Sequence, residues 1–203
     1  MSTKLFSAGL LAGLAMFVWG AISHMALPLG EVGIQTLPDD SAITAFLKDK
    51  IKAPGLYLYP GEKDMSKMEQ LLKERPRGLL TYTPAGTPFS MGLSLGVQCL
   101  NDILVGLLLA YLLSKAALPG LGAKMLYSVV LILFATAFYL APYWNWYGFP
   151  IAFVLANAIG GIIAGVIGAL VVTKFTSVRV RPYQKPLTID KSVGCGEFML
   201  AAI

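Results

Sequence analysis

The sequence predicts an all-α membrane protein: a bundle of four transmembrane helices with a small α+β insert between the first and second helix. Two observations lead to this fold class. The chain is 56% hydrophobic and only 13% charged, with a mean hydropathy of +0.69, whereas soluble domains carry roughly a quarter charged residues. The apolar residues also gather in four runs, each long enough to cross the hydrocarbon core of a bilayer, for which about 20 residues suffice.

The first predicted span covers residues 5–27 and contains no ionisable residue other than His24. A secretory signal peptide is the competing interpretation, because Lys4 makes a short basic region and residues 21–23 resemble a cleavage site. The apolar run is longer than that of a typical signal peptide, and Trp19 and His24 suit a membrane interface. We therefore expect a retained transmembrane helix.

Residues 28–88 differ in composition, with eight Lys or Arg residues and eight Asp or Glu residues. An amphipathic pattern after Asp39 predicts one helix, and a second is expected to pass through Met65. Residues 56–59 and 79–83 each precede a proline and are typical of short strands. A segment of this size has little core of its own, so we expect it to rest on the membrane helices or on a partner.

Three further spans are predicted at residues 89–114, 125–144 and 151–174, followed by a basic tail at 175–203. Four spans place both termini on one side of the membrane. The basic residues on that side are Lys4, Lys115, Lys124, Lys174, Arg179, Arg181, Lys185 and Lys191. The positive-inside rule therefore predicts cytoplasmic termini, a cytoplasmic tail and an extracytoplasmic insert.

An uncharged aromatic hairpin at residues 143–150 joins the third and fourth predicted spans. Its interfacial aromatic residues are Trp144, Trp146 and Tyr147. Rings with a polar tip collect where hydrocarbon meets the headgroups, so an aromatic belt is one interpretation. The other is a binding surface shared with Tyr57 and Tyr59 of the insert, which are expected on the same side of the membrane.

Three spans contain glycines spaced four residues apart, which permit close helix contacts in lipid. The pairs are Gly9 with Gly13, Gly92 with Gly96, and Gly161 with Gly165. Such pairs serve either packing within the bundle or an interface with another subunit. The spacing alone does not distinguish these two uses.

Asp102 is the one acidic residue inside a predicted span, roughly 18 Å below the outer end by helix rise. An ionised carboxylate at that depth costs a few kcal/mol, so it must be paired, hydrated or protonated. Together with Asn101 and Asn157 it could form a proton or cation site, or a polar anchor for a partner helix. The alternative is a protonated carboxyl group bonded to Asn157 or Thr136.

His24 is the single histidine of the chain. One imidazole could give one axial bond to a haem or a chlorophyll-type macrocycle. The alternative, which we prefer, is an interfacial histidine bonded to the backbone or to the insert. No cofactor and no metal site are predicted, and Cys99 and Cys195 suggest neither a disulfide framework nor a metal cluster.

The sequence contains no nucleophile elbow, HExxH motif, phosphate loop or dinucleotide fingerprint, so we expect no enzymatic activity. The net charge of +5 is spread over loops, which gives nucleic-acid binding little support.

Three segments together resemble a family of small uncharacterised bacterial inner-membrane proteins. They are residues 18–25 (VWGAISHM), 54–61 (PGLYLYPG) and 143–150 (YWNWYGFP). The resemblance covers residues 5–173 and leaves out the tail. It implies a bacterial inner-membrane location and says nothing of mechanism.

These features lead to three functional hypotheses. The first is a non-catalytic accessory subunit of a larger membrane complex, respiratory or photosynthetic, with membrane lipid and other integral subunits as partners. The second is a small transporter or channel accessory that uses Asp102. The third is a lipid-binding membrane protein, or a membrane enzyme, that uses the outer aromatic residues.

Overall fold

In the computed structural model, which describes residues 2–176, four helices are long and apolar enough to cross a membrane. They are Thr3–Ala26, Met91–Lys115, Gly120–Tyr147 and Ile151–Thr176. A two-stranded sheet lies between the first and second of them along the chain. The predicted set of four long apolar helices with a small sheet between the first and second is confirmed. The predicted tail begins within the last turn of the fourth helix, and residues 177–203 lie outside the described part.

Two of the spans contain a change of helix type. The first is α1 (Thr3–Ala21) continued by a π-helical turn (Ile22–Ala26), and the third is α5 (Gly120–Ala135), a second π-helical turn (Thr136–Leu140) and α6 (Ala141–Tyr147). The others are α4 (Met91–Lys115) and α7 (Ile151–Thr176). The third of these helices is longer than the predicted span 125–144, because it begins directly after Pro119 and ends at Tyr147, where Gly148 with a φ of 76° is the C-cap.

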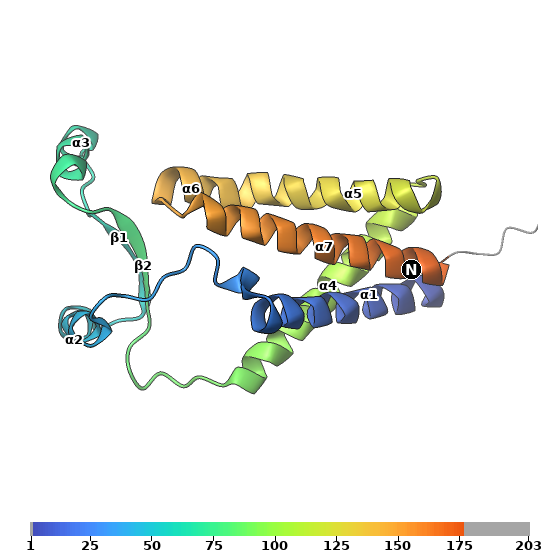
Figure 1. Cartoon of the computed structure of the whole chain (residues 1–203), viewed down its shortest axis with the longest axis horizontal. Helices are drawn as coiled ribbons and strands as arrows, with labels where there is room; N and C mark the ends of the chain where they lie inside the picture. Colours follow the sequence, from blue (N-terminus) through green and yellow to red (C-terminus); the bar gives the residue numbers. More distant parts are fainter. Residues whose placement is uncertain (1, 177–203) are drawn as a thin grey trace, which may run out of the picture.

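The helices pack in the order α4, α1, α7, α5. Helix α1 contacts both α4 and α7, and α7 contacts α5 on its other side. Figure 1 shows α1, α5 and α7 running roughly along one direction, whereas α4 crosses them obliquely. Only one end of α4 therefore lies within the bundle.

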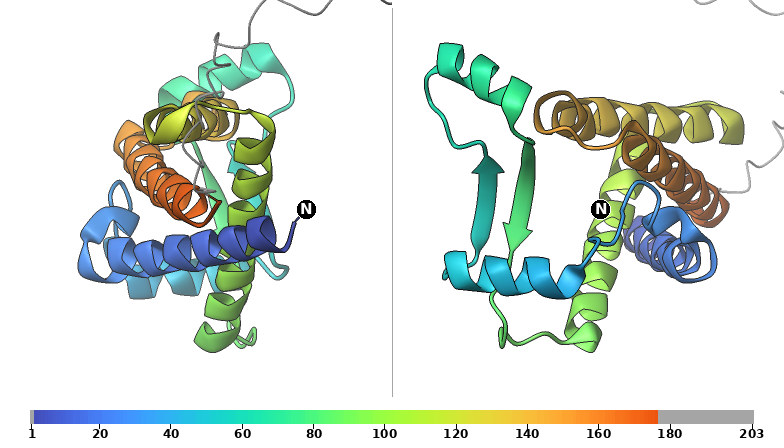
Figure 2. Two further views of the ribbon diagram at one scale, coloured as in Figure 1. Left: turned by 90° about the vertical axis from the view of Figure 1, so that its right-hand side faces the viewer. Right: turned by 60° about the vertical axis from the view of Figure 1, so that its left-hand side comes forward.

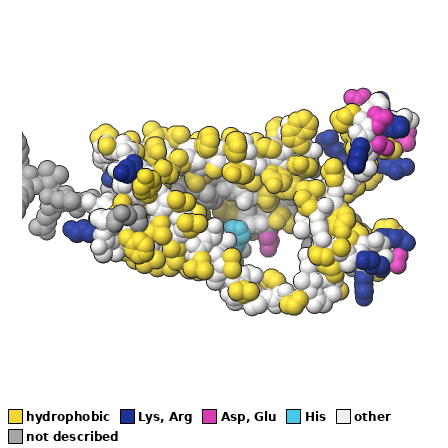
Figure 3. All heavy atoms as spheres, turned by 180° about the vertical axis from the view of Figure 1, so that it is seen from behind, with side chains coloured by type: hydrophobic (Ala, Val, Ile, Leu, Met, Phe, Trp, Pro, Cys, Tyr) yellow, Lys and Arg dark blue, Asp and Glu magenta, His cyan; other side chains and the backbone are white. Residues whose placement is uncertain are grey.

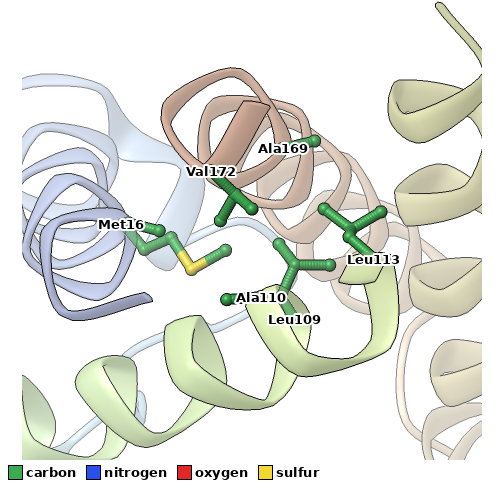
Figure 4. Close-up of a cluster of buried hydrophobic side chains, with 7 residues drawn as sticks. Met16, Leu109, Ala110, Leu113, Ala169 and Val172 are labelled. Atoms are coloured by element: carbon green, nitrogen blue, oxygen red, sulfur yellow. The ribbon is translucent and has the colours of Figure 1, made fainter. Parts of the chain in front are cut away.

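The core lies where α1, α4 and α7 meet (Figure 4). Its buried side chains are Ala12, Met16, Leu109, Ala110, Leu113, Ala169 and Val172. Three of the seven are alanines, and Gly168 of α7 faces the end of the Met16 side chain. Small residues on the facing helices make this close approach possible.

Glycines also set the crossing of α1 and α4. A Cβ atom on Gly13 would collide with the Cα atom of Ile103 and the carbonyl oxygen of Asp102. One on Gly106 would collide with backbone atoms of Gly9 and Gly13. The two backbones are thus in direct contact at this point, and the helices diverge on either side of it.

The insert is a two-stranded ribbon with a helix at each end (Figure 2). Its elements are α2 (Asp40–Lys50), β1 (Gly55–Tyr59), α3 (Met65–Glu74) and β2 (Gly78–Tyr82). The strands are antiparallel, and Tyr57 lies opposite Leu80. Asp39 and Asp64 cap the two helices through their side chains.

No residue from 24 to 105 is buried. This range includes the whole insert and the first fifteen residues of α4, from Met91 to Val105. Large apolar side chains of the insert are open to the surroundings, including Phe46 at 61% and Leu56 at 62% exposure. The ribbon thus has no core within the described residues.

Candidate functional site

The six predicted packing glycines divide into two groups. Gly9 and Gly13 contact α4, and Gly161 and Gly165 face Ile132 of α5. A Cβ atom on Gly92 or Gly96 would meet nothing within 4 Å. Two of the three pairs therefore serve the bundle itself, and the third leaves an open strip on α4.

A polar pair lies further along α4, roughly 120° around the helix from this open strip. The amide of Gln98 donates to Oδ1 of Asp102 at 3.0 Å. Asn101, the residue before Asp102, is exposed. The partners that we predicted for Asp102 are not bonded to it: Asn157 donates instead to the Phe153 carbonyl of its own helix at 2.8 Å. Thr136 lies in the π-helical turn after α5. Within the described residues, the carboxylate has Gln98 as its only side-chain partner.

Gln98 and Asp102 lie on one side of α4. Further along the helix, the same side faces the core. With 3.6 residues per turn, Gln98 and Asp102 lie within about 80° of Gly106, the residue that contacts α1. The same side of α4 is buried at Leu109 and Leu113. Gly13 of α1 still meets the backbone of α4 at Asp102 and Ile103, but no residue of α4 before 106 is buried, and Figure 1 shows the first part of α4 standing away from the bundle.

Helix α5 is also widely exposed but in a different way. Its exposed large side chains are all apolar: Leu121, Leu126, Val130, Leu133 and Phe134. Such a surface suits hydrocarbon chains without any further partner. The exposed half of α4 instead carries the amide groups of Gln98 and Asn101 and the carboxyl group of Asp102. Asp102 lies about 17 Å along the helix from Met91.

His24 lies in the π-helical turn at the end of α1. Its Nδ1 is 3.0 Å from the Gly20 carbonyl oxygen and 3.0 Å from the Ser23 hydroxyl oxygen. The ring packs against Gly30, where a Cβ atom would collide with it. This is the predicted backbone-bonded arrangement. The described residues contain no group of three His, Cys, Asp or Glu side chains that could hold a metal ion.

A hydrogen bond from Trp19 links α1 to α7 within the bundle. Its indole nitrogen donates to the carbonyl oxygen of Gly160 at 3.0 Å. This bond is compatible with the interfacial position that the sequence suggested, which stays a prediction.

A groove at the aromatic hairpin (residues 143–150) is lined by three parts of the chain that are far apart in the sequence. Its volume is about 450 Å³, and its lining includes Ile34, Tyr59, Arg77, Tyr147, Phe149 and Phe153. Of the aromatic residues that we predicted to share a surface, Tyr59 and Tyr147 do line it. Trp144 and Trp146 are not in the lining and are 49% and 72% exposed. Tyr57 bonds the Ala53 carbonyl instead, at 2.9 Å.

Arg77 of this groove was missed by sequence reasoning. It follows Pro76 in a charged stretch, where nothing distinguishes it from Arg75. Only the pairing of β1 with β2 brings residues 59 and 78 together and places Arg77 beside them.

No protein-family model, curated protein or solved structure matches this chain.

Proposed function

We propose that this chain is a non-catalytic accessory subunit of a larger complex in the bacterial inner membrane, of the respiratory or photosynthetic electron-transfer class. The observation that carries the proposal is the open, polar side of α4. Gln98 and Asp102 occupy the middle of a helix long enough to span a membrane, and no residue of α4 before position 106 is buried.

The composition of α4 supports a protein partner rather than lipid at this surface. Its exposed first half contains Gln98, Asn101 and Asp102, whereas its packed second half is almost wholly apolar. Polar and ionisable groups within a membrane are costly and nearly always face protein or a water-filled cavity. A partner helix that presents a hydrogen-bond donor would satisfy the carboxyl group. Gly92 and Gly96 lie roughly 120° around the helix from the polar pair and leave an adjoining face open.

The insert supports the same proposal from outside the membrane. A two-stranded ribbon is marginally stable on its own, and this one contains no buried residue. Its exposed apolar side chains, such as Leu56 and Leu58, lie on one face of β1. We propose that this face packs on an extracytoplasmic part of the partner.

The proposed orientation follows the basic residues. Figure 3 shows Lys and Arg side chains at the end of the bundle opposite the insert, and charges of both signs over the insert. Hydrophobic side chains cover the flank between these two ends. With the positive-inside rule, the termini are cytoplasmic and the insert is extracytoplasmic. We propose membrane lipid as the second contact of the chain, and no nucleic acid.

Site-specific photo-crosslinking in native membranes tests this proposal. A photoreactive phenylalanine derivative replaces Leu95 on the open side of α4, and the control position is Phe134, which is 68% exposed on apolar α5. We expect one discrete protein adduct from position 95 and none from position 134. An Asp102→Asn variant should weaken co-purification of the same partner in mild detergent.

Two results would overturn the proposal. One is a monomer that gives no adduct from either position. The other is proton or cation flux in proteoliposomes that disappears in Asp102→Asn, which would support the transporter hypothesis instead.

A further inference from the structure

We propose that the groove between the insert and the aromatic hairpin binds the headgroup of an anionic phospholipid, with the phosphate group against Arg77. This inference goes beyond the proposed function and does not depend on a partner subunit. It concerns a separate surface, formed by the β1–β2 ribbon, the segment after α1 and the α6–α7 hairpin.

Three residues that line the groove carry donor groups with no hydrogen-bond partner within residues 2–176. The guanidinium group of Arg77 makes neither an ion pair nor a hydrogen bond there, although the described salt bridges include other insert residues. The hydroxyl groups of Tyr59 and Tyr147 donate to no protein atom in the described part. No Asp or Glu side chain lines the groove. A positive charge with neighbouring free donors and no carboxylate suits a phosphate group, which accepts from all of them.

The remaining lining suits the part of a lipid that lies below its phosphate group. Phe149 and Phe153 pack edge to face, with ring centroids 5.6 Å apart. Together with Ile34 they give the groove an apolar side. A phospholipid has this same sequence of chemistry, from a charged headgroup through the glycerol backbone to hydrocarbon.

The groove also lies at the right level for a headgroup. Tyr147 is the last residue of the third span, and Phe153 lies within the first turn of the fourth. Headgroups meet a transmembrane helix at its ends, where Tyr and Trp collect. A free phosphate ion would use Arg77 equally well but would not need the two phenylalanine rings, so we commit to the lipid.

Lipid retention by the purified full-length chain tests the inference. The protein is extracted in mild detergent, exchanged into phosphatidylglycerol or phosphatidylcholine nanodiscs, and examined by native mass spectrometry after detergent release. We expect one phosphatidylglycerol molecule to be retained per chain. Arg77→Gln should weaken this retention about tenfold, the loss expected for one charge-assisted contact. Arg75→Gln is the matched control, because Arg75 lies two residues away and does not line the groove.

A second pair of variants guards against misfolding. Tyr147→Phe removes one hydroxyl group from the groove and keeps the ring, whereas Tyr143→Phe makes the same change one turn earlier, outside the lining. We expect only Tyr147→Phe to lower retention, by about threefold to tenfold. Equal retention in both members of both pairs would overturn the proposal, as would equal retention of the two lipids or competition by inorganic phosphate at millimolar concentration.

Discussion

The two halves of α4 belong to different environments although they form one unbroken helix. From Gly106 to Leu113 the helix is packed between α1 and α7, and four of its residues are buried. From Met91 to Val105 none is buried. The preceding residues 24–90, which include the whole insert, likewise contain no buried residue. Within residues 2–176, a packed region where α1, α4 and α7 meet is thus joined to a region, residues 24–105, in which no residue is buried.

This difference shows that helix formation and packing have separate causes in this chain. Ser90 caps α4 by accepting from the Leu93 amide at 3.3 Å, and an apolar sequence continues the helix without help from neighbours. Packing instead requires small residues on both helices at the same level. Gly9, Gly13 and Gly106 supply these at the crossing, whereas Gly92 and Gly96 have no counterpart within the described residues.

The largest effect is expected from adding the same side chain to each region. Gly13→Leu would force a side chain into the backbone of α4, so we expect the free energy of unfolding to fall by about 3 kcal/mol or the chain to fail to fold. Gly92→Leu adds the same atoms to open space and should change it by less than about 0.5 kcal/mol. Thermal unfolding of the detergent-purified chain measures both. Similar losses in the two variants would contradict the division into packed and open regions.

A smaller effect is expected from the hydrogen bond between α1 and α7. Trp19→Phe keeps an aromatic ring but leaves the Gly160 carbonyl oxygen without its indole donor, which should cost about 1 kcal/mol. Trp144→Phe is the control, because its side chain is 49% exposed in the outer hairpin. The same unfolding measurement compares them. A larger loss at Trp144 would mean that the hairpin contributes more to stability than this packing suggests.

The sequence predicted the local structure well because its causes are local. Four apolar runs give four long helices, and the prolines after Tyr59 and Thr83 mark the ends of the two strands. The amphipathic pattern after Asp39 likewise predicted α2 from local sequence. The sequence did not show which helices would pack within the bundle and which would have an open side, since all three glycine pairs have the same spacing.

The candidate sites depended on contacts between distant parts of the chain and were predicted only in part. Tyr59 and Tyr147 were expected to share a surface, and they do line one groove. Arg77 became visible only through the strand register, and the Asp102 partner proved to be Gln98, one turn away on the same helix. The expected partners on other helices required those helices to surround α4, which the oblique crossing prevents.

The smallest effect concerns α3, in the region without buried residues, and its response to acid. Asp64 accepts hydrogen bonds from the Ser66 hydroxyl group at 2.7 Å and the Ser66 amide at 3.0 Å, and these bonds lower the pKa of its carboxyl group below the ordinary 3.8. Two backbone amides lower the pKa of Glu62 in the same way. A lowered pKa in the folded state means that the carboxylate stabilises the fold above the ordinary pKa. This contribution is lost as the pH falls through the lowered value.

We therefore expect α3 to open locally below about pH 3.8, while the bundle keeps its protection because its buried side chains do not titrate. Hydrogen-exchange protection of the Ser66 and Met68 amides, corrected for intrinsic rates, measures the opening. Asp64→Asn preserves a capping oxygen that does not ionise, so its α3 should lose much less protection over this pH range. If acid lowered protection in α3 and in the α1–α4–α7 core together, the two regions would be one cooperative unit, and the insert would depend on the bundle far more than its lack of buried residues indicates.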